Sequence, residues 1–125
     1  EILEQQVRRM LKDDRASALA DNFAAQWLQL RRLETITPDP GYYPAFDEDL
    51  RRDSRRETEL FFSAVASDDL SVLTLLDADF SFINERLARH YGIPGIEGAH
   101  FRRVSFEDGR RGGILGHASI LTLTS

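Results

Sequence analysis

Apolar side chains recur at intervals of three and four residues along most of this chain, which is the spacing of one face of an α-helix. Stripes of this kind cover residues 3–11, 16–33 and 50–65. A chain of 125 residues buries roughly two-thirds of the surface that it exposes when unfolded, which is enough for one core. The pattern therefore predicts one mainly helical domain that spans residues 1–125.

Turn-forming and capping residues divide this pattern into separate helices. Residues 35–44 hold three prolines and one glycine, so this stretch cannot be helical throughout. Asp47 follows it and is a favourable N-cap for the next helix. A further helix is expected to begin at Asp79 or Ser81 and to end at Gly92, because glycine is common just beyond a helix.

The C-terminal part of the chain has a different character. Residues 101–106 alternate between apolar and polar side chains as a strand does, and Asp108-Gly109 is a strong turn signal for a β-hairpin. Residues 110–112 are the expected partner strand, and helical spacing favours a short helix within 113–124. The predicted fold is a bundle of four or five helices with a small β-hairpin near the C-terminus.

Large apolar side chains on these stripes are expected to form one shared core. Trp27 lies in the middle of its stripe, where a tryptophan is more often a core residue than a ligand platform. The side chains assigned to this core are Phe23, Trp27, Phe61, Phe62, Phe82, Leu87 and Tyr91.

Composition excludes several classes of function. The net charge of −5 argues against nucleic-acid binding, which needs a basic surface that releases counterions. No apolar run approaches the roughly 20 residues that a membrane-spanning helix needs, so membrane insertion is not expected. The chain has no cysteine, which excludes disulfides, thiolate metal ligands and haem attached through cysteine within it.

The two ends of the chain resemble cut ends. The sequence begins at Glu1, already in a helical pattern, and closes with the apolar-polar alternation of residues 121–125. We therefore expect a domain excised from a larger multidomain protein. Apolar residues near both ends are expected to contact adjoining parts of that protein, since uncovered apolar surface commonly marks an interface.

Four segments carry a resemblance to a known family when they are taken together and in order. They are FAAQWLQLRRL (23–33), RETELFF (56–62), LTLLDADFSFINERLARHYG (73–92) and RGGILGHASILTLTS (111–125). In combination they resemble the domain of unknown function numbered 1592, which occurs mostly in Planctomycetes and related bacteria.

This resemblance implies a cellular location and neighbouring domains, but it does not imply a reaction. Domains of that family are found in large multidomain proteins beside a c-type cytochrome domain. The resemblance implies a periplasmic or cell-surface location and haem c in a neighbouring domain. No cofactor is expected in this domain, because it lacks cysteine and its histidine spacing fits no metal site. The expected function is that of a non-catalytic structural or docking module whose partners are the adjacent domains of the same chain.

Two polar clusters are the candidate sites for chemistry or anion binding. Arg86 and His90 fall on one face of the helix that ends at Gly92, and His90 lies in the last turn, where the helix dipole favours a cation. Arg110 and Arg111 precede two glycines, an arrangement that can hold an anion.

Each cluster also has a purely structural interpretation. Arg86 and His90 can cap a helix or bind loop carbonyls, and the glycines can simply allow a bend. The histidines, at positions 90, 100 and 117, match no zinc signature, so no metal site is predicted. The alternative function is a part of an enzyme active site, completed by flanking modules, to which His90 or Arg110 and Arg111 contribute.

Overall fold

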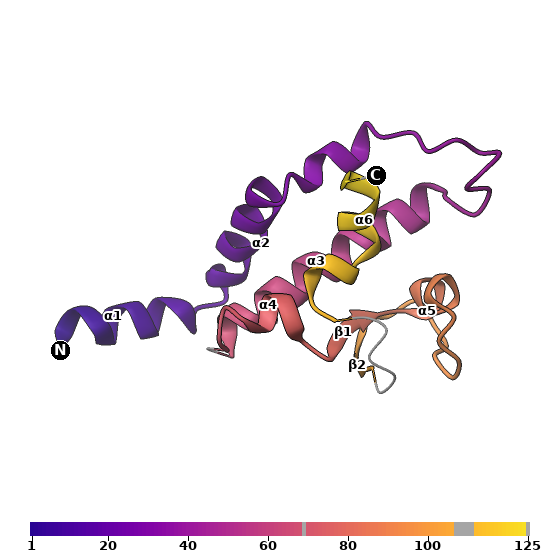
Figure 1. The fold of residues 1–125 in the computed structure, drawn as a ribbon. Helices are drawn as coiled ribbons and strands as arrows, with labels where there is room; N and C mark the ends of the chain where they lie inside the picture. The colour runs from indigo at the N-terminus through magenta and orange to yellow at the C-terminus, as the bar shows by residue number, and fades with distance from the viewer. Residues whose placement is uncertain (69, 107–111, 125) are drawn as a thin grey trace.

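The computed structural model describes residues 1–68, 70–106 and 112–124, which form a mainly α-helical domain with one small antiparallel sheet (Figure 1). The predicted fold class is therefore confirmed. The elements are α1 (Ile2–Leu11), α2 (Arg15–Trp27), the 3-10 helix η1 (Leu30–Glu34), α3 (Glu48–Ser67), α4 (Thr74–Asp77), β1 (Phe80–Ile83), α5 (Glu85–Tyr91), β2 (Arg102–Ser105), the 3-10 helix η2 (Ile114–Gly116) and α6 (Ala118–Thr124).

Helix α3 is the central element, against which α2, β1, α5 and α6 pack. As predicted, Asp47 caps it: a carboxylate oxygen accepts the backbone N–H of Leu50 at 2.8 Å. The predicted stripe is also confirmed, since Leu50, Phe61 and Val65 are buried on one side of the helix. Polar side chains share this buried side and form the network described below.

The second apolar stripe belongs to two elements and not to one continuous helix. Helix α2 ends at Trp27, and Gln29 adopts a left-handed conformation with φ of 55° before η1 begins. The 3-10 helix then turns Leu30 and Leu33 into the core. The helical spacing of these leucines was therefore informative about burial, although the helix itself is interrupted.

The helix predicted to begin at Asp79 or Ser81 begins later, at Glu85. The preceding residues form strand β1, and Asn84 caps α5 by accepting the N–H of Leu87 at 3.1 Å. A run of four extended residues is too short to be told from a helix by its periodicity. The helix ends as predicted, with Gly92 in the left-handed conformation at φ of 74°.

The small sheet has a different partner strand from the one expected. Strand β2 confirms the strand predicted within 101–106, but it pairs in antiparallel fashion with β1, with Ser81 opposite Val104. Helix α5 therefore lies between the two paired strands in the sequence. Gly112 lies in no strand, whereas the predicted turn at Asp108-Gly109 and the adjoining Arg110-Arg111 lie outside the described residues.

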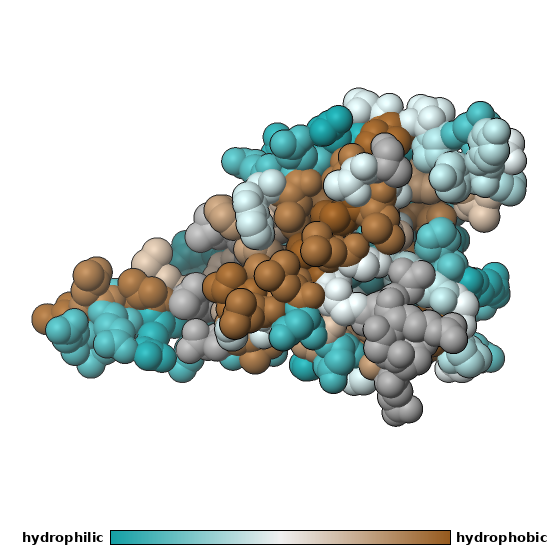
Figure 2. Space-filling view, viewed as in Figure 1, coloured by the Kyte–Doolittle hydropathy of each residue, from teal (hydrophilic) through white to brown (hydrophobic). Residues whose placement is uncertain are grey.

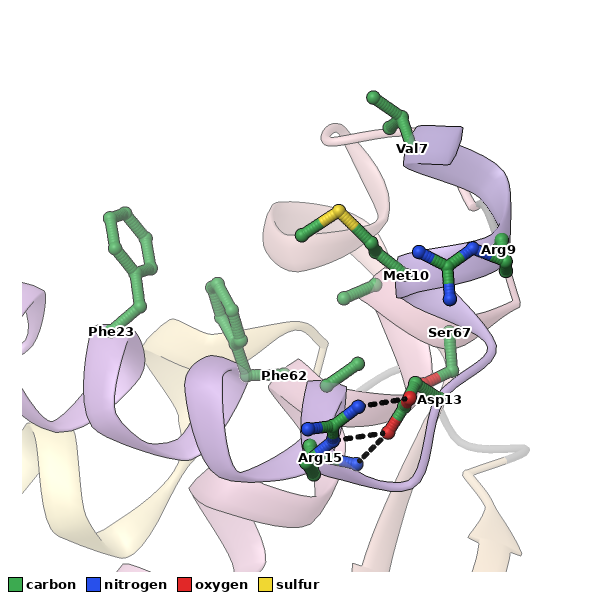
Figure 3. Close-up of a pocket in the computed structure, with 10 residues that line it drawn as sticks. Val7, Arg9, Met10, Asp13, Arg15, Phe23, Phe62 and Ser67 are labelled. Carbon is green, nitrogen blue, oxygen red and sulfur yellow. Dashed lines mark hydrogen bonds and ion pairs between the residues drawn. The ribbon is translucent and has the colours of Figure 1, made fainter. Parts of the chain in front are cut away.

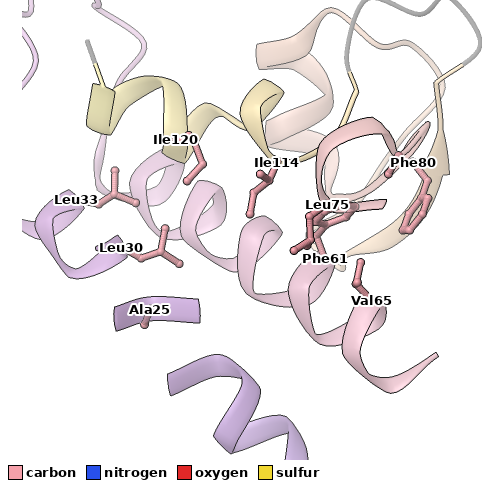
Figure 4. Close-up of a cluster of buried hydrophobic side chains, with 10 residues drawn as sticks. Ala25, Leu30, Leu33, Phe61, Val65, Leu75, Phe80, Ile114 and Ile120 are labelled. Atoms are coloured by element: carbon pink, nitrogen blue, oxygen red, sulfur yellow. The ribbon is translucent and has the colours of Figure 1, made fainter. Parts of the chain in front are cut away.

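Buried apolar side chains form two clusters where one core was expected. The larger one centres on Phe61 and reaches Phe80, Ile114 and Ile120 (Figure 4). The smaller one joins α3 to α5. Its buried members are Leu50, Ile83, Leu87 and Ala88. The partly buried residues packed against them are Phe46, Tyr91, Ile93, Ile96, Phe101 and Val104. The predicted core residues are thus divided: Phe61, Phe62 and Phe82 belong to the first cluster, and Leu87 and Tyr91 to the second.

Two side chains assigned to the core lie on the surface instead. Phe23 and Trp27 are 55% and 57% exposed. Their rings stack with centroids 6.0 Å apart, and each also contacts the ring of Phe62. The neighbouring residues Ala24 and Ala25 of α2 are buried, whereas the two aromatic side chains lie on an exposed side of the same helix.

The segment from Gly113 onward closes the larger cluster. The predicted helix within 113–124 is confirmed as η2 followed by α6, which place Ile114 and Ile120 in the core. Gly113 has φ of 63°, and a Cβ atom at this position would lie 2.3 Å from the backbone oxygen of Leu76. Only glycine fits this crossing without displacing the backbone of the neighbouring segment.

Candidate functional site

Arg86, one of the predicted site residues, joins α5 to α3. Its guanidinium lies 2.7 Å from the carboxylate of Asp53 and 3.3 Å from that of Asp49. Asn84 donates to the same Asp53 carboxylate at 2.9 Å, so the buried aspartate is held by two donors. The hydrogen bond to Asp53 is the main cause that raises the pKa of Arg86 above its ordinary value. This arrangement has the geometry of a structural brace.

His90 lies at the other end of α5, on an exposed position beside Tyr91. The two rings have centroids 5.6 Å apart. Both residues line a hollow of about 410 Å³, together with Ser54 and the aromatic segment around Tyr42. Arg86 is not among the residues that line this hollow. Arg110 and Arg111, the other predicted site residues, lie outside the described residues.

A buried polar network that the sequence analysis did not identify lies directly behind this hollow. Its centre is Glu57, which is only 1% exposed. One carboxylate oxygen accepts the hydroxyl of Ser81 at 2.6 Å, and the other accepts the hydroxyl of Tyr91 at 2.5 Å. The imidazole Nε2 of His117 lies 3.9 Å from the carboxylate and 3.4 Å from the hydroxyl of Ser81.

The network continues on the other side of His117. Its Nδ1 lies 2.9 Å from the hydroxyl of Thr58, which in turn lies 2.6 Å from the hydroxyl of Ser119. All three residues are buried. The backbone N–H of Ala118 donates to the hydroxyl of Tyr91 at 2.9 Å, so the residue that follows His117 is also hydrogen-bonded to the network.

The chemistry of this network is that of a polar cross-link. It connects α3, β1, α5 and the start of α6, which come from four separate parts of the chain. Burying a carboxylate is costly unless it is hydrogen-bonded, and both oxygens of Glu57 have donors. The serine, histidine and glutamate are covered by surrounding elements, so the network fixes how those elements pack.

No local motif marks this network in the sequence. Glu57 and Thr58 occur within the RETELFF segment, yet the residues they contact lie 24 to 61 positions away. Ser119 lies one hydroxyl away from His117, because Thr58 contacts both of them. The available signal was the presence of glutamate and threonine on an otherwise buried helical stripe.

One uncovered apolar surface crosses the body of the domain. It is formed by exposed leucines from α4, η2 and α6 and from the turn before α4, and we call it the leucine face. Its members, which are 50% to 67% exposed, are Leu73, Leu76, Leu115 and Leu121. Helix α4 contacts η2, and η2 contacts α6, so the segments that carry these leucines are neighbours. Figure 2 shows hydrophobic residues as a band across the molecule in this region.

A second apolar surface is a groove between α1 and the pair formed by α2 and α3. The groove has a volume of about 750 Å³. Phe23 and Phe62 rise on one side of it, and Val7 and Met10 project from α1 on the other (Figure 3). A hydrogen-bonded ion pair between Asp13 and Arg15 lies at the corner where α1 meets α2, and Arg15 holds the pKa of Asp13 below its ordinary value.

Two other kinds of site are absent from the described ranges, 1–68, 70–106 and 112–124. Within them, no three histidine, cysteine or acidic side chains are grouped so that they would hold a metal ion. Within the same ranges, no helix combines the length and the apolar character that crossing a membrane requires.

These features define a small helical domain with a buried polar cross-link and two uncovered apolar surfaces. The chain belongs to the family described as protein of unknown function (DUF1592), whose model matches residues 1–93. The resemblance found in the sequence is therefore confirmed at the level of the family. No curated protein and no solved structure matches the chain.

Proposed function

We propose that this domain is a non-catalytic structural or docking module, which binds an adjoining module of a larger protein through the leucine face. The observation that carries the proposal is the exposure of four leucines from α4, the turn before it, η2 and α6, in which α4 contacts η2 and η2 contacts α6. Contiguous apolar surface on a folded domain commonly marks a contact with another polypeptide.

The arrangement of polar residues supports the same function. The polar cluster around Glu57 is buried, and its hydrogen bonds join separate elements of the fold. Arg86 is engaged by two aspartates of α3. A rigid body that presents an apolar face is suited to positioning its neighbours, because a preorganised surface loses little conformational entropy on binding.

The setting of the module is also part of the proposal. The larger protein is exported to the periplasm or the cell surface and carries a c-type cytochrome domain, as the resemblance to the family implies. Any haem is then bound outside this domain, since covalent attachment of haem c requires cysteine, and this chain has none. We expect the exported parent protein to contain haem. We expect this domain, purified alone, to contain none.

A second candidate function has one observation in its favour. The hollow of about 410 Å³ brings His90 together with Tyr91 and Ser54, and the Ser54 hydroxyl has no hydrogen-bond partner within the described part of the chain. Completed by a flanking module, this hollow is a candidate part of an active site. Loss of a parent-chain activity in a His90→Gln variant that folds normally would favour this function over docking.

The docking function is tested by joining this domain to its neighbouring module in the parent protein. We expect the neighbour to raise the melting temperature of the domain and to slow hydrogen exchange in α4 and α6. A variant with Leu73→Glu and Leu76→Glu is expected to lose both effects, because a charge on the contact surface must be desolvated on binding.

The matched control is the variant with Val7→Glu and Met10→Glu, which places the same two charges on exposed apolar positions of α1, outside the leucine face. This control should retain the stabilisation by the neighbour. Equal melting temperatures and equal exchange in α4 and α6 with and without the neighbouring module would contradict the docking function.

A further inference from the structure

Helix α1 is amphipathic, and its apolar side is uncovered. It projects from the body of the domain (Figure 1). Its apolar residues Leu3, Val7 and Met10, between 48% and 77% exposed, follow one another at spacings of four and three. This is the spacing of the contact seam between two packed helices. A ten-residue helix is marginal in water on its own, so packing against a partner would stabilise α1.

The groove beside α1 also exposes apolar surface. Its walls are mainly apolar, with Phe23 and Phe62 on one side and Val7 and Met10 on the other, and Arg9, Asp13 and Arg15 also line it. Helix α1 forms one of these walls and therefore cannot also occupy the groove. Both α1 and the groove therefore expose apolar surface, and a second amphipathic helix could cover both.

The charges on α1 favour a second copy of the same helix as its partner, with the two helices antiparallel. Acidic residues lie near the start of the segment, at Glu1 and Glu4, and Glu4 pairs with Arg8 within the helix. Basic residues lie near its end, at Arg8, Arg9 and Lys12. Of the two aspartates that follow, Asp13 and Asp14, the first pairs with Arg15 of α2. Two such helices placed in parallel would bring like charges together. Placed antiparallel, the acidic end of each lies beside the basic end of the other, an arrangement that favours pairing.

We propose that two copies of this chain associate through α1, with the two helices antiparallel about a two-fold axis and each lying along the groove of the other copy. Each copy then supplies the same two parts, its helix α1 and its groove, as a two-fold interface requires. The contact uses α1, α2 and α3. None of the four leucines of the leucine face lines this groove.

Sedimentation of the isolated chain tests the association. We expect a concentration-dependent dimer, and a monomer for the variant with Val7→Glu and Met10→Glu. Circular dichroism establishes that this variant keeps the helical content of the parent chain. The variant with Leu73→Glu and Leu76→Glu is the matched control and should still form the dimer, because its charges lie on the leucine face.

Reversal of charge tests the partner without introducing charges into the apolar seam. A basic variant (Glu1→Lys with Glu4→Lys) and an acidic variant (Arg8→Glu, Arg9→Glu with Lys12→Glu) are each expected to repel a second copy of themselves. Each should be monomeric alone, and a mixture of the two should form a mixed dimer.

Single cysteines test the direction of the helices, because the chain contains no other cysteine. A bifunctional thiol reagent with a short spacer should link an Ile2→Cys copy to a Lys12→Cys copy and should not link two Ile2→Cys copies. The opposite result would overturn the antiparallel arrangement. A parent chain that sediments as a monomer throughout, or a dimer unaffected by Val7→Glu with Met10→Glu, would overturn the interface itself.

Discussion

The hydroxyl of Tyr91 lies 2.5 Å from the carboxylate of Glu57, and the tyrosine is the more accessible member of the pair. Its ring lines the hollow beside His90, while its hydroxyl reaches into the buried network and also accepts the backbone N–H of Ala118. One oxygen atom therefore joins α5 to the centre of α3 and to the start of α6.

Tyr91→Phe is expected to lower the free energy of unfolding by about 1–3 kcal/mol, because it leaves a buried carboxylate oxygen and a backbone N–H without this partner. Urea denaturation measures the change. Tyr42→Phe removes the same atom from an exposed tyrosine and serves as the control. Equal stability of the two variants would show that the hydroxyl of Tyr91 contributes nothing to the network.

Gly113→Ala is expected to destabilise the domain by more than about 1 kcal/mol, because the added methyl group meets the backbone of Leu76 and the conformation at φ of 63° disfavours alanine. Gly112→Ala is the adjacent control, since its Cβ would lie 3.6 Å from the nearest backbone oxygen, an ordinary contact. Thermal unfolding followed by circular dichroism distinguishes the two. A larger effect at Gly112 would be inconsistent with the close approach described here.

Phe61→Ala is expected to cost about 3–5 kcal/mol, the usual effect of deleting a fully buried aromatic side chain. The ring packs against Phe80, with centroids 5.3 Å apart, and against His117. Trp27→Ala should cost far less, because more than half of that side chain is already exposed. Chemical denaturation of both variants compares them, and the reverse order would restore Trp27 to the core.

Stability at acidic pH is expected to depend on Glu85. The backbone N–H of Gly98, with a further contribution from Arg89, holds the pKa of this carboxyl below its ordinary value. Folding therefore favours the charged form. Its contribution is complete above the unfolded pKa of about 4.3 and is lost as the pH falls through the lower folded pKa.

Glu85→Gln keeps an acceptor for Gly98 and removes the titration. We expect the melting temperature of the parent chain to fall more steeply than that of this variant as the pH is lowered from about 5 to 3, the range in which a glutamate with a lowered pKa titrates. Parallel curves for the two proteins over this range would contradict a lowered pKa at Glu85.

Local sequence signals were sufficient for several elements of the fold. Asp47 and Gly92 mark the start of α3 and the end of α5 because capping depends on a single residue and its immediate neighbours. Spacing also identified the buried side of α3 and the helix at the end of the chain. In each of these cases the decisive interaction is within one turn of the residues that signal it.

Features that depend on distant segments were not predictable in this way. Phe80-Ser81-Phe82-Ile83 forms a strand because β2, about 20 residues further on, supplies its hydrogen bonds. The exposure of Phe23 and Trp27 depends on which side of α2 meets α3, and the spacing of a stripe does not specify this. The candidate site shows the same limit, since Arg86 was identified and its partners Asp49 and Asp53 on α3 were not.

The polar network has a consequence for the order in which the chain acquires its structure. Thr58 meets His117 and Ser119, which follow it by 59 and 61 residues. At ribosomal speeds of about 5–20 residues per second, some 3–12 seconds separate the synthesis of Thr58 from that of its partners. A nascent chain that has reached only residue 93, the limit of the family match, still lacks both of them. The buried polar side of α3 can therefore be fully paired only after the segment that carries His117 and Ser119 has been synthesised.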